Sequence, residues 1–317
     1  MNILIVGGTR FLGKKIVEIL AEKKHNLTVL SRHLNNFPQE NIIQICKERD
    51  HGLIDLKGCS FDLTLDFIGY DGNDPIDLLS IIETKGYVLI SSTWVPRLWR
   101  GVNANELLSS YNLNNSDFEK KTIDYLKGKA NAENAIMSLR KKGYNSTILR
   151  LPITLGEGDH TGRFNFYPDR LIDGNNIILV DRGQNKAQIA EMKDMAKVII
   201  KWIEEIDIFH LPLWEALPGE GRNIRSIIKL MASSLNLEAK LVDVSITELV
   251  KFFSDYLIYE PFWRETSLEL SNTNIYYKTG LIPASFGKDF NICNFPNPII
   301  NNFRNKELKF LENRSTY

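Results

Sequence analysis

Short apolar segments alternate with amphipathic ones through the first half of the chain. Residues rich in Ile, Val and Leu predict strands at Asn2–Val6, Leu27–Ser31, Ile42–Cys46, Leu63–Ile68, Gly86–Ser91 and Ser146–Arg150. Apolar positions at helical spacing predict helices at Leu12–Lys23, Asp74–Thr84 and Thr122–Lys142. Because the strands are apolar at nearly every position, we expect both faces of a parallel sheet to be buried. The pattern therefore predicts an α/β fold with a Rossmann-like, doubly wound parallel sheet.

The second half of the chain has a different pattern. Residues 156–176 are rich in Gly, Asp and Asn, and we expect them to leave the sheet. Helical patterns follow at 191–206 and 223–236, then an aromatic cluster at 252–263 that we expect to pack as core and lid. We expect a Rossmann domain of residues 1–157 and about 178–210. Residues of about 158–177 and 211–317 would form a smaller, mostly C-terminal α/β lobe, ending in a short surface helix.

A glycine-rich turn, VGGTRFLG, separates the first predicted strand from the first predicted helix. Gly7 permits a tight turn, and Gly13 lets the helix approach the sheet closely. A helix N-terminus offers free N–H groups and a positive dipole end, which suit a pyrophosphate. Arg10 stands where the usual dinucleotide loop has another glycine. A permanent cation there suits a ribose 2′-phosphate or another cofactor phosphate, or it is simply a solvated turn residue.

The end of the second strand distinguishes the two nicotinamide cofactors. Proteins that bind NAD place Asp or Glu there, about 20 residues beyond the glycines, to hold the ribose 2′-hydroxyl. Here Ser31 stands at that place and Arg32 follows it. A carboxylate would repel a 2′-phosphate, whereas a hydroxyl and a guanidinium would bind it. We therefore expect NADP(H) rather than NAD(H).

Composition argues against several other classes of protein. Lys and Arg total 39, as do Asp and Glu, and a chain of zero formal charge lacks the positive field of a protein that coats nucleic acid or a membrane surface. Three widely spaced cysteines fit a reducing cytoplasm better than a disulfide framework. No His-x-x-x-His or similar spacing predicts a metal site, and no Gly-x-Ser-x-Gly elbow predicts a hydrolase.

Further motifs, in order along the chain, carry a resemblance to a known family. They are DLTLDFIGY, YVLISSTWVP, YLKGK, ILRLPITLGEGD and AEMKDMAKVI. With the glycine turn, this set resembles the extended or atypical short-chain dehydrogenase/reductase superfamily, in its NAD(P)-dependent epimerase/dehydratase branch. GGTRFLG is similar to the loop of one subgroup with arginine at the middle position. The resemblance covers roughly residues 1–290 and implies an enzyme that transfers a hydride at an alcohol or carbonyl carbon.

The resemblance also implies site residues. Tyr125 and Lys129, four positions apart on one helix face, match Tyr-x-x-x-Lys; the ammonium would lower the pKa of the phenol so that it can exchange a proton. Ser92 matches the catalytic serine, with Thr93 as the next choice and Ser91 also possible. The expected cofactor contacts are Gly7, Gly8, Thr9, Arg10, Phe11, Leu12, Gly13, Ser31, Arg32, Ile68, Gly69, Tyr125, Lys129 and Pro152.

Other residues leave alternatives open. His160, Arg163 and Arg170 could contact a substrate or be solvated, and Asp194 is expected to help form a helix near the cofactor. The insert of residues 103–116 is expected to loop near the substrate. Thr93 and Trp94 stand where dehydratases of the branch carry Asp-Glu, which disfavours dehydration.

Reduction or epimerisation of a small polar substrate, such as a nucleotide sugar, remains. The alternative is a non-catalytic nucleotide-sensing or RNA-binding protein on the same fold. A homodimer is possible, since relatives often pair through the helix with Tyr-x-x-x-Lys.

Overall fold

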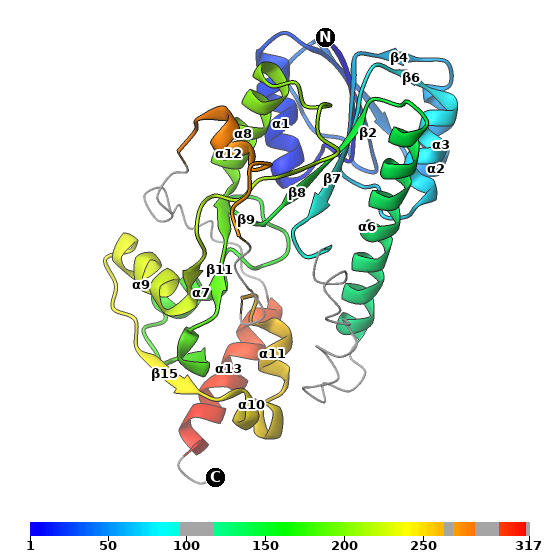
Figure 1. The fold of residues 1–317 in the computed structure, drawn as a ribbon. Helices are drawn as coiled ribbons and strands as arrows, with labels where there is room; N and C mark the ends of the chain where they lie inside the picture. The colour runs from blue at the N-terminus through cyan, green and yellow to red at the C-terminus, as the bar shows by residue number, and fades with distance from the viewer. Residues whose placement is uncertain (96–116, 263–268, 283–297, 315–317) are drawn as a thin grey trace.

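A seven-stranded parallel sheet organises the N-terminal part of the molecule (Figure 1). The computed structural model describes residues 1–95, 117–262, 269–282 and 298–314. The strand order is β13-β8-β7-β5-β1-β2-β3. Their bounds are Leu213–Glu215 for β13, Ser146–Leu151 for β8, Tyr87–Ser92 for β7, Leu63–Asp66 for β5, Asn2–Val6 for β1, Asn26–Ser31 for β2 and Ile42–Cys46 for β3.

The observed sheet confirms the predicted fold class. Each of the six predicted strands is present, with ends that differ by no more than two residues. Adjacent strands pair in parallel, β1 with both β2 and β5. The seventh strand, β13, was not predicted, because three residues leave too short a pattern to recognise.

Helices cover both faces of this sheet (Figure 1). α1 (Phe11–Glu22), α8 (Met192–Glu205) and α12 (Ile275–Thr279) pack on one face, and their apolar side chains share one core with β1, β2 and β5. α2 (Arg49–Leu53), α3 (Asn73–Ile81) and α6 (Asp117–Lys141) lie on the other face, over a second core. α3 ends before the predicted Thr84, because Glu83–Thr84 form a short strand, β6, that pairs with β4 (Ser60–Phe61).

A second lobe has its own hydrophobic core. Its helices are α7 (Phe166–Ile172), α9 (Ile224–Ser234), α10 (Ile246–Phe252), α11 (Asp255–Tyr259) and α13 (Pro298–Asn313). Its short strands pair β10 (Ile177–Val180) with β15 (Leu241–Val244), and β11 (Lys186–Ala187) with β14 (Arg222–Asn223). β9 (Ile153–Leu155) pairs with β12 (Ile189–Glu191) where the chain passes between the lobes. In the described ranges, no helix is both long and apolar enough to cross a bilayer.

The C-terminal helix α13 is not the surface helix that the sequence predicted. Phe303 and Phe310 are buried in the core of the second lobe. Glu307, also buried, forms an ion pair of 2.8 Å with Arg170 of α7, which explains how the helix can bury a charge. The buried partner of Glu307 lies in α7, far away in the sequence, so the hydropathy pattern of the tail alone does not reveal that this helix packs into the core.

The loop after β5 packs against α6 at Gly128. A Cβ atom at Gly128 would overlap the backbone oxygen of Tyr70, so only glycine permits this approach. Carboxylate Oδ2 of Asp74 accepts hydrogen bonds from the backbone N–H groups of Tyr70, at 2.6 Å, and Asp71, at 2.9 Å. Arg49 in turn pairs with Asp74 and with buried Asp66 at the end of β5. The backbone of the loop is thus bound by Asp74 at its C-terminal end, and Arg49 links Asp74 to Asp66 at its N-terminal end.

We predict that Gly128→Ala destabilises the protein by about 1–3 kcal/mol, the usual cost of inserting a methyl group into a packed contact. In an exposed helix the same change would stabilise by about 1 kcal/mol. Equilibrium urea denaturation followed by circular dichroism measures the free energy of unfolding. Asn134→Ala, at an exposed position of α6, is the control and should change it by less than about 0.5 kcal/mol. A Gly128→Ala protein as stable as the wild type would contradict this packing.

Candidate active site

A cavity of about 1040 Å³ opens at the carboxyl ends of the parallel strands, between the two lobes. This edge of a doubly wound sheet is where ligands bind. Its volume is at the upper end of the range for small-molecule sites, so it can hold a cofactor together with a small substrate. Among the predicted residues it is lined by Gly7, Thr9, Arg10, Phe11, Leu12, Gly13, Ser31, Arg32, Ile68, Ser91, Ser92, Tyr125, Lys129, Pro152, His160 and Arg163.

The glycine turn lies beneath one part of this cavity and fits a pyrophosphate. Gly7 has a φ of 89°, and a Cβ there would lie 2.6 Å from Ile68. A Cβ at Gly13 would approach the backbone of Gly8 to 3.1 Å, so the close contact of α1 with the turn requires glycine. No side chain caps the N-terminus of α1, whose first N–H groups therefore remain available to a ligand.

Two predicted cofactor residues lie outside the cavity wall. Gly8 is buried below the turn, where a Cβ would collide with Ile5. Gly69 packs against Leu89, at 2.8 Å from a hypothetical Cβ. At both positions a neighbouring side chain occupies the place where a Cβ atom would lie. Glycine is therefore required for packing at Gly8 and Gly69.

Basic side chains gather beyond the turn, at the end of β2. Arg10 donates a hydrogen bond of 2.6 Å to Nε2 of His33, and Arg32 lies 3.9 Å from Glu48. Lys47 also lines this end of the cavity. Ser31 donates its hydroxyl hydrogen to the backbone oxygen of His33 at 2.7 Å, so its oxygen remains as an acceptor only. In this arrangement the two guanidinium groups, rather than the hydroxyl, are the donors offered to a phosphate.

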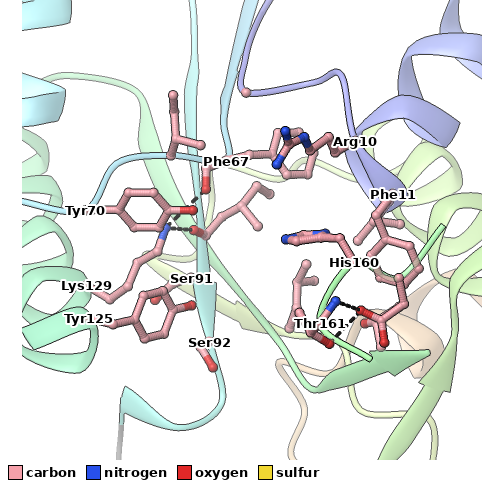
Figure 2. A pocket seen from close by; sticks show the side chains of 18 of the residues that line it. Arg10, Phe11, Phe67, Tyr70, Ser91, Ser92, Tyr125, Lys129, His160 and Thr161 are labelled. Atoms are coloured by element: carbon pink, nitrogen blue, oxygen red, sulfur yellow. Dashed lines mark hydrogen bonds between the residues drawn. The ribbon is translucent and has the colours of Figure 1, made fainter. Parts of the chain in front are cut away.

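The opposite end of the cavity holds Tyr125, Ser92 and Lys129 (Figure 2). Among the three candidate hydroxyl groups, Ser92 is the one that acts on the phenol of Tyr125, whose pKa it lowers. Ser91, one position earlier on β7, instead donates to Glu133 at 2.6 Å, and Thr93 is buried outside the cavity. Ser92 is therefore the hydroxyl group best placed to work with Tyr125.

The ammonium group of Lys129 is turned into the protein. Its Nζ donates to the backbone oxygen of Ile90 at 2.8 Å and to that of Phe67 at 3.3 Å. The ring of Tyr70 lies over it, with its centroid 4.4 Å away (Figure 2). Burial disfavours the charged form and lowers the pKa of Lys129 to about 8, although Asp66 opposes the shift.

The sequence predicted that the ammonium of Lys129 lowers the pKa of the Tyr125 phenol, but the pKa of this phenol is raised. Burial, followed by neighbouring Tyr70, raises the pKa of Tyr125 to about 12. The groups that lower it are Arg163 and Ser92, while Lys129 is directed at strand carbonyls instead of the phenol. The ring still reaches the open cavity, where 41% of the residue is exposed. At neutral pH Tyr125 is therefore a proton donor.

The second lobe supplies the facing wall. Thr161 bonds to Asp159 through both its N–H and its hydroxyl, and His160 projects between them toward the cavity (Figure 2). Leu257, Glu260 and Pro261 of the aromatic cluster line the same wall. This agrees with the expected core and lid role, since other members of that cluster are buried.

Arg170 does not reach the cavity. It is buried within the second lobe, bound to Glu307 and to the backbone oxygen of Phe166. The expectation that it could contact substrate is wrong, because the buried carboxylate of α13 binds its charge. Asp194 lies in the first turn of α8, where its backbone N–H donates to the side chain of Glu191, so the carboxylate that caps this helix is that of Glu191.

Several residues that line the cavity were not among the site residues predicted from the sequence. Phe67, Tyr70 and Trp94 follow the ends of β5 and β7, at the same edge as the predicted residues. Their position after a buried strand was the available signal. The insert of residues 103–116, which was expected to loop near the substrate, lies outside the described residues. In the described ranges, no group of three or more His, Cys, Asp or Glu side chains could hold a metal ion.

Solved structures share this fold across nearly the whole chain. UDP-N-acetylglucosamine 4-epimerase from Bacillus cereus has a TM-score of 0.61 at 15% identity, covering 93% of this chain and 99% of its own. A UDP-glucuronic acid 4-epimerase variant from Bacillus cereus, in complex with a fluorinated substrate analogue and NAD, has a TM-score of 0.61 at 12% identity, covering 92% and 96%. The dTDP-glucose 4,6-dehydratase from Bacillus anthracis, in complex with NAD, has a TM-score of 0.60 at 14% identity, covering 91% of this chain and 93% of its own.

A search of curated proteins gave no match. The sequence itself matches the NAD dependent epimerase/dehydratase family over residues 3–210, about two thirds of the chain. This span contains the glycine turn, both cavity ends and all seven strands of the sheet except β13. The chain therefore belongs to the NAD dependent epimerase/dehydratase family, a family of enzymes that use a nicotinamide cofactor.

Proposed function

We propose that this enzyme transfers a hydride between NADP(H) and an alcohol or carbonyl carbon of a small polar substrate, as a reductase or an epimerase. One observation carries the proposal: Ser92, Tyr125 and Lys129 line the same cavity as the glycine turn. When bound, the cofactor would supply or accept the hydride. A non-catalytic role in nucleotide sensing or RNA binding would not need this second group of residues.

The protein side chains then handle the substrate oxygen and its proton. Ser92 donates a hydrogen bond to that oxygen and orients it toward Tyr125. With a pKa of about 12, the phenol is protonated near neutral pH and donates its proton to the oxygen of a carbonyl that receives a hydride. One hydride and one proton convert the carbonyl into an alcohol. The phenol is thus in the protonated form that the reductive step uses.

Elimination of water needs a further acid or base next to the reacting carbon, and three of the carboxylates that line the cavity are already engaged in other contacts. Asp159 accepts hydrogen bonds from Thr161 and Phe164, and Asp74 is paired with Arg49. Glu260 accepts from the hydroxyl of Tyr167. These carboxylates hold the walls of the cavity together, so we favour reduction or epimerisation over dehydration.

The substrate class follows from the fold neighbours and the two-lobe cavity. The neighbouring epimerases act on UDP-N-acetylglucosamine and UDP-glucuronic acid. We propose a nucleotide sugar as the substrate of this chain as well. The second lobe, which has its own core, contributes His160 and Arg163 to the wall that faces the reactive end of the cavity. We further propose that this lobe, mainly residues 158–177 and 211–317, binds the substrate, while residues 1–157 and most of 178–210 bind the cofactor. β10 belongs with the second lobe, because it pairs with β15.

We predict that Tyr125→Phe lowers turnover by about 10²- to 10⁴-fold, because general acid catalysis contributes about that much. NADPH affinity should stay within about twofold of wild type, since the ring remains. Turnover is measured as epimerisation of UDP-glucuronic acid and UDP-N-acetylglucosamine by NMR, and as NADPH oxidation with 4-keto nucleotide sugars. Tyr144→Phe, at an exposed tyrosine outside the cavity, is the control. Equal turnover by Tyr125→Phe and wild type would show the catalytic assignment to be wrong.

We predict that the protein binds NADPH more tightly than NADH in a fluorescence titration. Arg32→Ser should weaken NADPH binding about tenfold and leave NADH binding unchanged, because one charge-assisted hydrogen bond to the 2′-phosphate is lost. Lys229→Ser removes an equal charge from an exposed position of α9, away from the cavity, and should change neither affinity. Tighter binding of NADH than of NADPH by the wild type would contradict the assignment.

A further inference from the structure

Tyr70 lies at the reactive end of the cavity, and its sequence motif, DLTLDFIGY, assigned it no role. It follows β5, and its ring centroid lies 5.8 Å from that of Tyr125 and 4.4 Å from Nζ of Lys129 (Figure 2). An ammonium has three N–H donors. Two of those on Lys129 are bound by the backbone oxygens of Ile90 and Phe67. The aromatic face of Tyr70 therefore covers a side of the ammonium that the carbonyls leave open.

The position of this ring is determined by its backbone. Asp74 accepts the N–H of Tyr70, and Gly128 allows the carbonyl of Tyr70 to lie against α6. Partial burial and the charge of Asp66 raise the pKa of Tyr70, so its ring stays a neutral phenol over the working pH range. A neutral ring presents the negative face of its quadrupole to a cation.

The charge of Lys129 is finely balanced. Asp66 of β5, Asp74 of α3 and Glu133 of α6 favour the ammonium, while Arg49 of α2 and burial disfavour it. The two other titratable groups beside it, Tyr70 and Tyr125, are both neutral phenols. The resulting pKa of about 8 lies close to neutrality. A modest contact can therefore decide how much of Lys129 is charged in the neutral range.

We propose that Tyr70 is a positioning residue for Lys129: its ring face stabilises the ammonium and keeps it charged beside the reactive end of the cavity. The catalytic consequence rests on the function proposed above, but the effect on the charge of Lys129 does not. An attractive ring favours the protonated form, so its removal must lower the pKa of Lys129. The charged fraction would then be lost at a lower pH than in the wild type.

The direct test is an NMR titration of cofactor-free protein labelled with ¹³C at the lysine ε-carbons, with the Lys129 signal identified by its absence from Lys129→Arg. We expect Tyr70→Leu to lower the midpoint of Lys129 by about one pH unit, given the strength of cation–π contacts at desolvated sites. Tyr70→Phe retains the ring face and should stay within about 0.3 unit of the wild type. These two variants separate the aromatic face from the hydroxyl group.

An unchanged midpoint in Tyr70→Leu would overturn the proposal. So would a fall in Tyr70→Phe as large as that in Tyr70→Leu, because the effect would then belong to the hydroxyl. If Tyr70→Leu fails to fold, Tyr70→Met replaces it, with the same expected fall and the same overturning result.

A second measurement separates this proposal from the proposed function. In active enzyme, the alkaline limb of kcat/KM should move to lower pH in Tyr70→Leu, by the same amount as the NMR midpoint, and stay in place in Tyr70→Phe. A shifted midpoint in a protein that fails to bind NADPH would support the role of Tyr70 and contradict the proposed function. A protein that binds NADPH but whose Lys129 midpoint is unchanged in Tyr70→Leu would support the proposed function and contradict the role of Tyr70.

Discussion

The reactive end of the cavity depends on the burial of one ammonium group. Lys129 is almost fully removed from solvent, and a charge in that position is stable only where acceptors surround it. Those acceptors come from two segments: the loop after β5, with the backbone oxygen of Phe67 and the ring of Tyr70, and strand β7, with the backbone oxygen of Ile90. Satisfying one cation therefore fixes the relative positions of the strand ends and α6, and with them the distance between Tyr125 and Ser92.

A network of buried charges supports this arrangement from below. Asp66 accepts hydrogen bonds from both guanidinium ends of Arg49 and from the hydroxyl of Tyr87, within the core beside β5. Arg49 continues to Asp74, which holds the loop of Tyr70. Arg49 also lines the cavity. The same guanidinium thus reaches the cavity wall and holds the loop of Tyr70 through Asp74.

The fold could largely be predicted from sequence because its strands are apolar throughout and its helices have a clear period. The glycine turn and Tyr-x-x-x-Lys could be found because each is local in sequence. Tyr70 and Arg49 could not be found that way, since their importance comes from contacts across 59 and 17 positions with Lys129 and Asp66. Arg170 was misjudged for the same reason, as its partner Glu307 lies 137 positions away.

We propose that one cavity holds the cofactor with its adenosine end at Arg10 and Arg32 and its nicotinamide at Tyr125. A local motif at the N-terminus and a helix more than a hundred residues later would then bind the same molecule, at a sheet edge that both share. A crystal structure of the protein with NADP⁺ tests this arrangement most directly. We expect the pyrophosphate at the N-terminus of α1, the 2′-phosphate between the two arginines and the nicotinamide ring beside Tyr125. A cofactor bound in the reverse direction, or outside this cavity, would contradict it.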